Sequence, residues 1–261
     1  MNANLPHSLD LSGKFGLITG IANEHSIAWG CARAMRALGA ELAVTYANAK
    51  AEPYVRPLAE QLDCSLFMPC DVQQPGELEA VFTAIEKRRG QLDFLLHSIA
   101  FAPRDDLHGR VVDCSRTGFG VAMDVSCHSF IRMAKLAEPL MKDGGTLLTV
   151  TYIGADAVIP NYNLMGPVKA ALEATSRYLA AELGPQGIRV HAISPGPLAT
   201  RAGSGLKDFD ALLHDSAARS PLRRLVTIDE VGALAAFLVS DAAAGMTGNE
   251  TYVDGGYHIV G

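Results

Sequence analysis

The chain has 261 residues, which suits one large α/β domain or two small domains and is enough for a full hydrophobic core. Apolar residues make up 49% and charged residues 19%, so the composition is that of a globular chain and excludes intrinsic disorder. The 22 Lys and Arg residues against 28 Asp and Glu residues give a net charge of −6, which argues against a nucleic-acid-binding protein because phosphate binding needs a basic surface.

The sequence offers no membrane or export signal, and its cysteines favour a reducing compartment. No stretch approaches the roughly 20 apolar residues that span a bilayer. The N-terminal segment lacks a charged region followed by an apolar one, so no signal peptide is expected. The five cysteines are odd in number and no pair has CxxC spacing. We therefore expect a reduced, cytoplasmic protein with no zinc or other metal site and no membrane or nucleic-acid partner.

Short apolar runs alternate with longer amphipathic runs along the whole chain. Most of the short runs are apolar at both odd and even positions, which is typical of strands buried on both faces. The predicted strands span residues 15–19, 41–46, 65–68, 92–98, 145–152, 188–193 and 250–253. The predicted helices span residues 27–38, 54–61, 76–89, 116–141, 165–183 and 228–240.

Local end signals agree with these elements. Gly39 and Gly184 follow the first and fifth helices at C-cap positions, and Thr227 with Glu230 forms a capping box before the last helix. Strand–helix alternation predicts an α/β fold: a single Rossmann-type domain over residues 1–261, with a doubly wound parallel sheet of about seven strands. Right-handed crossovers then place the ligand site at the carboxyl ends of the strands.

The loop after the first strand has features of a dinucleotide-phosphate turn. Gly20 supplies the tight bend, and Ser26 and Ala28 are small enough for a pyrophosphate to approach the backbone at a helix start. Strict GxGxxG is absent, because Glu24 and Ser26 occupy positions where many such turns carry glycine. An ordinary strand–helix loop is the alternative, and the position at the first strand favours the phosphate turn.

The end of the second strand bears on the choice between NADH and NADPH. Many dinucleotide folds place an acidic residue there to hold the ribose hydroxyls. Residues 45–50 contain neither Asp nor Glu to reject a 2′-phosphate and no Arg to bind one, and Lys50 is the nearby cation. We expect NADH as the cofactor, with NADPH as the alternative.

Tyr162 and Lys169 are seven residues apart, after the strand that ends near Tyr152. On an ideal helix this spacing corresponds to about 700° and a rise of about 10.5 Å, so both side chains would face one cleft. A tyrosine can donate to a developing oxyanion, and a nearby ammonium favours its ionised form and can hold a ribose. A core aromatic with a solvated lysine is the alternative. Pro167 is compatible with a helix that begins near Asn163.

Several motifs follow one another along residues 10–257. They are GIANEHSIAWG, AELAVTYANAK, CDV, HSIAFAP, TYIGADAVIPNYNLMGPVKAALEA, ISPGPLAT, PLRRLVTIDEVG and YVDGG. Taken in order, these motifs resemble the NADH-dependent enoyl-acyl carrier protein reductases, a divergent branch of the short-chain dehydrogenase/reductases. The spacing Tyr–x6–Lys is typical of this branch, whereas ordinary members use Tyr–x3–Lys, and here Met165 stands four before Lys169.

The resemblance implies NADH-dependent reduction of the trans-2 double bond of enoyl thioesters in fatty acid synthesis. Tyr162 matches the catalytic tyrosine that stabilises the enolate, Lys169 the lysine that holds the cofactor ribose, and Tyr152 the second active-site tyrosine. The other matches are Gly20, Ser26 and Ile27 (pyrophosphate), Asp71 and Val72 (adenine), Ala47, Ser98, Ile99 and Ala100 (adenosine ribose), Leu198 and Thr200 (nicotinamide amide and pyrophosphate), and Ala102 (substrate).

The resemblance also implies a mobile substrate lid at about residues 200–212, for which a disordered surface loop is the alternative. In the family this lid carries basic residues that meet the acidic carrier protein. Here Lys207 remains, but Asp210 and Ala211 occupy positions where bases are common. Candidate replacements are Arg201, Arg219, Arg223 and Arg224. The carrier is therefore less well defined than the chemistry, and coenzyme A thioesters are an alternative substrate.

Other functions and departures from the family stay open. A related reductase of an enone or ketone is one alternative, and a regulatory protein that senses the NADH/NAD balance is another, although Tyr162 and Lys169 argue against the latter. The resemblance implies a homotetramer, with the small-residue helix 170–181 at a two-fold axis.

His191 and Pro195 replace the usual Asn and Ala, and we favour a packed surface histidine and a stiffened loop over an altered nicotinamide segment. Asp156 is expected to be a solvated loop carboxylate. His25, His97 and His128 are expected to be packing or surface residues.

Overall fold

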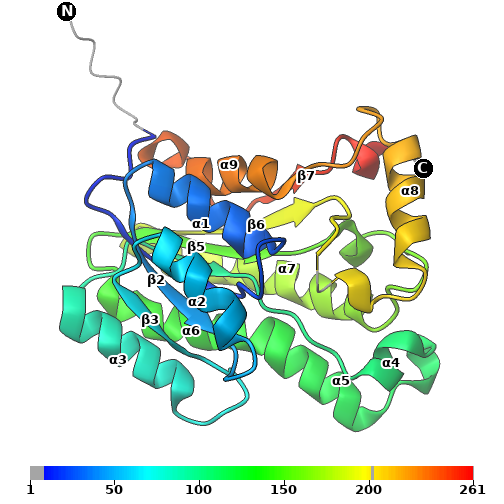
Figure 1. Cartoon of the computed structure of the whole chain (residues 1–261), viewed down its shortest axis with the longest axis horizontal. Coiled ribbons are helices and arrows are strands. Elements are labelled where there is room, and N and C mark those ends of the chain that lie inside the picture. The colour runs from blue at the N-terminus through cyan, green and yellow to red at the C-terminus, as the bar shows by residue number, and fades with distance from the viewer. Residues whose placement is uncertain (1–8, 201–202, 261) are drawn as a thin grey trace, which may run out of the picture.

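The computed structural model describes residues 9–200 and 203–260. Seven strands form one sheet in the order β3-β2-β1-β4-β5-β6-β7, and every neighbouring pair is parallel (Figure 1). The strands are β1 (Phe15–Thr19), β2 (Glu41–Tyr46), β3 (Leu66–Pro69), β4 (Phe94–His97), β5 (Gly145–Val150), β6 (Ile188–Pro195) and β7 (Glu250–Val253). The predicted doubly wound parallel sheet is confirmed.

Helices cover both faces of the sheet. Helices α1, α2 and α9 pack on one face, and α3, α6 and α7 pack on the other (Figure 1). The helices are α1 (Ile27–Ala37), α2 (Glu52–Gln61), α3 (Glu77–Arg89), α4 (Arg104–His108), α5 (Arg116–Met123), α6 (Ser129–Ala137), α7 (Met165–Leu183), α8 (Phe209–Arg219) and α9 (Ile228–Val239). Within residues 9–200 and 203–260, none of these helices combines the length and the apolar character needed to cross a bilayer.

Strand β1 shows why the apolar runs have no alternation. All five of its residues are buried. Leu17 belongs to the core under α3, α6 and α7, whereas Ile18 belongs to the core under α1, α2 and α9. A strand with a helical layer on each side must be apolar at both odd and even positions, because successive side chains point to opposite faces.

The strand order reverses between β1 and β4. Strand β1 pairs with β2 on one side and with β4 on the other, so the crossover from β3 to β4 returns past two strands. In open parallel sheets, the crevice at such a reversal, outside the carboxyl ends of the strands, is where ligands bind.

The predicted helix 116–141 is interrupted, contrary to expectation. Helix α5 ends at Met123, a π-helical turn spans Asp124–His128, and α6 begins at Ser129. In this turn the Ser126 hydroxyl accepts a hydrogen bond from the Phe101 N–H (2.9 Å) and donates one to the Phe101 carbonyl (3.1 Å). The break therefore ties the helix to the loop after β4, and π-helical turns of this kind are frequent at functional sites.

The predicted helix ends are mostly confirmed. The capping box of Thr227 and Glu230 is present at the start of α9. Gly39 follows α1 with a left-handed φ of +99°. Gly184 lies at the C-cap position of α7 but keeps a helical φ of −54°, and the left-handed conformation is taken by Gly187, after one 3-10 turn.

Candidate active site

Most of the predicted cofactor-binding residues lie in loops that follow five different strands, whereas Ile27 opens α1 and Lys169 lies on α7. Gly20 follows β1, Ala47 follows β2, Asp71 and Val72 follow β3, residues 98–100 follow β4, and Leu198 and Thr200 follow β6. Because all the strands are parallel, these loops lie at the same edge of the sheet. The structure therefore places residues from distant parts of the chain at one edge.

Gly20 lies where the sheet order reverses. Its φ is +93°, and a Cβ atom at this position would stand only 2.0 Å from the Ser98 carbonyl oxygen. Both the left-handed conformation and the close contact require glycine. The turn after β1 and the loop after β4 are thus in direct contact.

Ser26 builds the turn that precedes α1. It is buried, and its hydroxyl accepts hydrogen bonds from the N–H groups of Ala22 (3.0 Å) and Asn23 (3.1 Å). Its side chain makes no cap bond to α1, which begins at Ile27. The Ser26 hydroxyl therefore holds the loop in shape, while the backbone N–H groups of the first helical turn are the groups that suit a phosphate.

Two loops flank the predicted adenosine end of the site. The Asp71 carboxylate accepts from the Gln73 N–H (2.9 Å), and the Val72 carbonyl accepts from the Arg132 guanidinium (2.6 Å). Ala47 is exposed directly after β2. These bonds hold the loop after β3 in place, and the end of β2 offers no carboxylate.

Leu198 and Thr200 form a compact turn after β6. Leu198 is buried, and its carbonyl accepts from the Thr200 N–H at 2.7 Å. The Thr200 hydroxyl accepts from the Gly203 N–H at 3.0 Å. Thr200 thus connects this turn to the predicted lid.

The two candidate catalytic tyrosines pack against each other. The ring centroids of Tyr152 and Tyr162 are 4.9 Å apart, with an angle of 66° between the planes. A Cβ atom at Gly154 would stand 2.3 Å from the Tyr162 ring, so only glycine leaves room for it. Tyr162 is 9% exposed, and the hydroxyl of Tyr152 is buried with no hydrogen-bond partner among the described residues. An unpartnered buried hydroxyl here suits a polar ligand group.

Tyr162 does not lie on the helix that carries Lys169. Helix α7 begins at Met165, and Tyr162 lies in the turn before it, between Asn161 (φ +64°) and Asn163 (φ +44°). Asparagine tolerates the left-handed conformation better than most residues, and two such residues redirect the chain. The expectation that the pair shares one helical face is therefore wrong, although both follow β5.

Lys169 is buried, with 5% of its surface exposed. Its ammonium donates a hydrogen bond of 2.7 Å to the Val150 carbonyl at the end of β5. An ammonium has three donors, so this bond leaves two for other partners. Burial lowers the pKa of Lys169 to about 8. The side chain can thus offer a charged donor to a hydroxyl group at neutral pH.

Burial raises the pKa of both tyrosines above the ordinary value. Tyr152 and Glu173 raise the pKa of Tyr162 further, and Lys169 is not among the groups that act on it. The expectation that the ammonium favours an ionised tyrosine is therefore not met. Tyr162 is a neutral phenol that can donate a hydrogen bond.

An apolar cluster surrounds the Tyr162 ring. Its buried members are Ala122, Tyr162, Leu164, Met165 and Val168. Ala102, the predicted substrate contact, packs against this cluster, and so does Leu206 from the predicted lid. The cluster supplies an apolar wall beside a phenol donor, which suits an apolar substrate with one polar group.

The described part of the predicted lid lies against α4. The segment contains a 3-10 turn at Gly203–Gly205, and its end overlaps the first turn of α8. His108 donates a hydrogen bond from Nε2 to the Gly205 carbonyl (2.7 Å). Residues 201 and 202, and with them the candidate base Arg201, lie outside the described residues.

The remaining candidate bases near the lid are engaged by neighbouring groups. Arg219 pairs with Asp215 at 3.2 Å, and Arg224 pairs with Glu230 at 2.6 Å. Arg223 donates to the carbonyl of Ala218. Lys207 is exposed. The charge available to an acidic carrier is therefore reduced by these internal pairs.

Two histidines lie in the core, and for His97 this is the packing role expected of it. His97 bonds to the hydroxyls of Thr149 (2.9 Å) and Ser129 (2.8 Å), and burial lowers its pKa to about 3. His191 is fully buried in β6, so the expectation of a surface residue is wrong; burial lowers its pKa to about 4. Both are neutral core residues. Pro195 is the last residue of β6 and is also buried.

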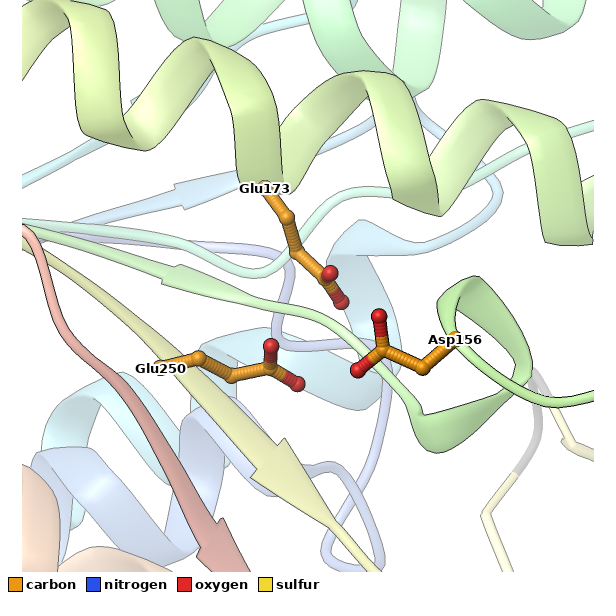
Figure 2. A group of neighbouring side chains, drawn as sticks. All are labelled: Asp156, Glu173 and Glu250. Atoms are coloured by element: carbon orange, nitrogen blue, oxygen red, sulfur yellow. The ribbon is translucent and has the colours of Figure 1, made fainter.

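One side-chain group was not found by sequence reasoning. The carboxyl groups of Asp156, Glu173 and Glu250 point toward one another beside the end of β5 (Figure 2). Asp156 is an exposed loop carboxylate, as expected, and it also accepts a hydrogen bond of 2.9 Å from Tyr252. The local sequence gives one sign that Glu173 lies near the site: it follows Lys169 by four residues and is therefore on the same face of α7.

The chain is similar to known proteins over nearly its whole length. The model of the family described as "Enoyl-(Acyl carrier protein) reductase" matches residues 20–258. A curated relative from Rhizobium meliloti, "Enoyl-[acyl-carrier-protein] reductase [NADH] 2", is 50% identical over 249 residues, which cover 95% of this chain and 93% of that protein.

Solved structures give the same result. The reductase from Anaplasma phagocytophilum, solved in complex with NAD, has a TM-score of 0.93 and 47% identity, covering 98% of this chain and 97% of that one. The reductase from Bacillus cereus, solved with NADP+ and indole naphthyridinone, has a TM-score of 0.94 and 48% identity, covering 96% and 98%. The chain thus belongs to the enoyl-acyl carrier protein reductase family, as its motifs predict.

Proposed function

We propose that this chain is an enoyl-acyl carrier protein reductase, which uses NADH to reduce the trans-2 double bond of enoyl thioesters in fatty acid synthesis. The relatives named above support an NADH-dependent oxidoreductase with an acyl carrier protein thioester as substrate. The observation that carries the proposal is the placement of the neutral Tyr162 phenol against Tyr152 and the apolar cluster.

Tyr162 supplies the hydrogen bond that the reaction needs. Reduction at Cβ of an enoyl thioester places negative charge on the thioester oxygen. A protonated phenol at that oxygen stabilises the enolate, and the low-polarity surroundings strengthen the interaction. Because burial keeps Tyr162 protonated, the donor is present across the neutral range. The proton that completes Cα is then taken from solvent.

Lys169 positions the cofactor. Its buried ammonium, fixed by the Val150 carbonyl, has two donors left for ribose hydroxyls. A fixed ribose sets the distance and angle of hydride transfer. Tyr152 lines the same site with an unpartnered hydroxyl and contacts Tyr162.

The residues at the sheet edge fit a dinucleotide. Gly20 places no side chain between the turn after β1 and the Ser98 carbonyl, and α1 begins at Ile27, at the end of that turn. Gly20, Ser26 and Ile27 would hold the pyrophosphate, and Asp71, Val72, Ala47 and residues 98–100 the adenosine. NADH, when bound, supplies the hydride.

The preference for NADH over NADPH rests on the NADH-dependent relatives, and the end of β2 is compatible with it. No carboxylate there repels a 2′-phosphate, and no arginine binds one. The Bacillus cereus relative was solved with NADP+. We therefore expect NADH to be preferred and NADPH to be used at a lower rate.

The first test is the loss of nicotinamide absorbance with crotonyl-acyl carrier protein and with crotonyl-coenzyme A, each with NADH and with NADPH. We expect turnover with NADH that is faster on the carrier form. Turnover on coenzyme A alone would favour the alternative substrate, in keeping with the internally paired arginines near the lid. NADH binding without turnover on either thioester would contradict the proposal and favour an NADH-sensing protein or a reductase of another enone or ketone.

We also propose that the whole chain acts as one catalytic domain in a cytoplasmic homotetramer, with residues 200–212 as a mobile lid. The exposed part of α7 supports the assembly: Tyr178 is 73% exposed beside small residues of the same helix. Burying such an aromatic across a two-fold axis favours association. Sedimentation as a monomer at micromolar concentration would contradict the tetramer.

A further inference from the structure

Three acidic side chains from separate elements converge beside the catalytic residues (Figure 2). Glu173 comes from α7, Glu250 from the first position of β7, and Asp156 from the loop after β5. One carboxylate oxygen from each lies within 4.8 Å of the other two. The group is thus assembled by tertiary structure, which local sequence does not predict.

The three negative charges need compensation. Glu173 is 4% exposed, and its carboxylate accepts a hydrogen bond of 2.6 Å from the Thr151 hydroxyl. The Glu173 carboxylate acts to raise the pKa of Lys169, but the ammonium of that lysine donates its hydrogen bond to Val150. Burial first, and then Glu250 and Asp156, raise the pKa of Glu173 to about 7, and burial likewise raises the pKa of Glu250. Either a proton or a metal cation must therefore relieve the repulsion.

A second observation points to a ligand. Ser194 on β6 is fully buried, and its hydroxyl has no hydrogen-bond partner among the described residues. Ser194 pairs with Tyr252, two residues after Glu250, so Ser194 and Glu250 lie on the same face of the sheet. The hydroxyl faces the Glu250 carboxyl closely enough to lower its pKa. Oε1 of Glu250 is itself buried without a partner. Buried oxygens of this kind normally have a partner.

We propose that Asp156, Glu173 and Glu250, with the Ser194 hydroxyl beside them, form a binding site for a hard divalent cation. Carboxylate and hydroxyl oxygens are the ligands that Ca²⁺, Mg²⁺ and Mn²⁺ prefer. The site lies outside the set of residues that hold cofactor and substrate, so its occupancy does not depend on the proposed function.

The spacing of the oxygens bears on the size of the ion. Oxygens on opposite sides of Ca²⁺ are about 4.6–5.2 Å apart, and those around Mg²⁺ about 4.0–4.2 Å apart, from the usual metal–oxygen distances. The observed upper limit of 4.8 Å lies within the span of a calcium-sized ion. A smaller ion needs the carboxylates to close by a few tenths of an ångström.

A cation here would join three elements that support the active site. Asp156 is four residues after Tyr152, and Glu173 is four residues after Lys169. Binding would therefore fix the loop after β5 against α7 and β7, and it would stabilise the folded state by mass action. The role is one of support, since none of the three carboxylates contacts Tyr162 or the reacting atoms in the proposed arrangement.

The test is calorimetric titration of the chelator-treated full chain with CaCl₂, MgCl₂ or MnCl₂, at a pH of about 8 because protons compete with metal for carboxylates. We expect one site per chain for at least one of these ions. Asp156→Asn and Glu250→Gln should each weaken binding about tenfold or more, since each loses a charged ligand. Asp156 is exposed, so its variant keeps the fold even where Glu250→Gln does not.

Glu182→Gln is the matched control. Glu182 is an exposed glutamate on the same helix as Glu173, and its substitution removes one charge far from the cluster. It should leave binding unchanged. The proposal is overturned if none of the three ions binds at about 10 mM, a concentration above the weakest oxygen-ligand sites. Binding that persists unchanged in Asp156→Asn also overturns it. In the first case the cluster holds a proton instead.

Discussion

The ammonium of Lys169 donates a hydrogen bond of 2.7 Å to the carbonyl oxygen of Val150, the last residue of β5. Two residues after this strand ends lies Tyr152, whose ring contacts Tyr162. The lysine on α7 is therefore fixed to the strand end that supports the tyrosine pair. The Val150 carbonyl therefore fixes the position of a cofactor held by this ammonium relative to the phenol of Tyr162.

Replacing Tyr162 by Phe should separate chemistry from binding. The ring and its contacts remain, but the donor to the enolate is lost, so kcat should fall about 10²- to 10³-fold while NADH affinity changes little. Steady-state rates with crotonyl-acyl carrier protein, together with a fluorescence titration of NADH, measure both quantities. Tyr54→Phe, at an exposed tyrosine of α2, is the control and should behave as wild type. Full activity in Tyr162→Phe would remove this residue from the mechanism.

Replacing Lys169 by Ala should weaken NADH binding. Hydrogen bonds to a charged group contribute about 1.5–3 kcal/mol, so affinity should fall by about 10- to 100-fold. Lys135→Ala, at an exposed lysine of α6, removes the same charge away from the site. Titration with NADH compares the two variants, and equal affinity would exclude Lys169 from the cofactor site.

The lowered pKa of the buried Lys169 ammonium also leads us to expect that stability depends on pH. Its pKa is lowered from 10.5 to about 8 by burial, so the folded chain releases this proton before the unfolded chain does. Between pH 8 and 10.5 the unfolded state binds more protons, and this contribution to the free energy of unfolding rises with pH. Below pH 8 both states are protonated and the penalty is fully present.

Denaturant unfolding at several alkaline pH values tests this sign. Lys169→Met should lack the rise that wild type shows across the window, because it has no proton to release. NADH affinity should move the other way in wild type and fall above pH 8, where the ammonium is lost. Parallel stability curves for the two proteins would show that Lys169 titrates normally.

Gly20→Ala should damage the cofactor turn far more than its backbone angle alone explains. A Cβ atom there meets the Ser98 carbonyl at 2.0 Å, at a φ of +93°. Gly13 has a similar φ of +83° but nothing within 4 Å, so Gly13→Ala isolates the cost of the angle, about 1–2 kcal/mol. Gly20→Ala should lose more stability than this and should bind NADH poorly. Equal unfolding midpoints in the two variants would contradict the close contact.

The regular elements were predictable where local and long-range forces agree. Strands β1, β2 and β7 and helix α7 have the predicted bounds, because dense apolar runs and clear end signals coincide there. Strand β5 ends at Val150, two residues before the predicted end, where the chain turns away to present Tyr152. The family motifs predicted the cofactor and tyrosine segments from residues that are close together in sequence.

Features set by tertiary contacts were missed. The π-helical turn depends on the bonds between Ser126 and Phe101, which are 25 residues apart. The position of Tyr162 ahead of α7 depends on two left-handed asparagines. The carboxylate cluster joins Asp156, Glu173 and Glu250, and no local pattern links these positions.

The pairing of β1 with β4 has a kinetic consequence. The Thr19 hydroxyl donates to the Leu96 carbonyl, 77 positions along the chain, and the turn at Gly20 is complete only when Ser98 lies against it. Closing so long a loop is entropically costly, and such contacts form slowly during folding. The cofactor crevice should therefore be absent from the folding transition state. NADH should then lengthen the lifetime of the folded enzyme, seen as a lower unfolding rate, without accelerating its refolding.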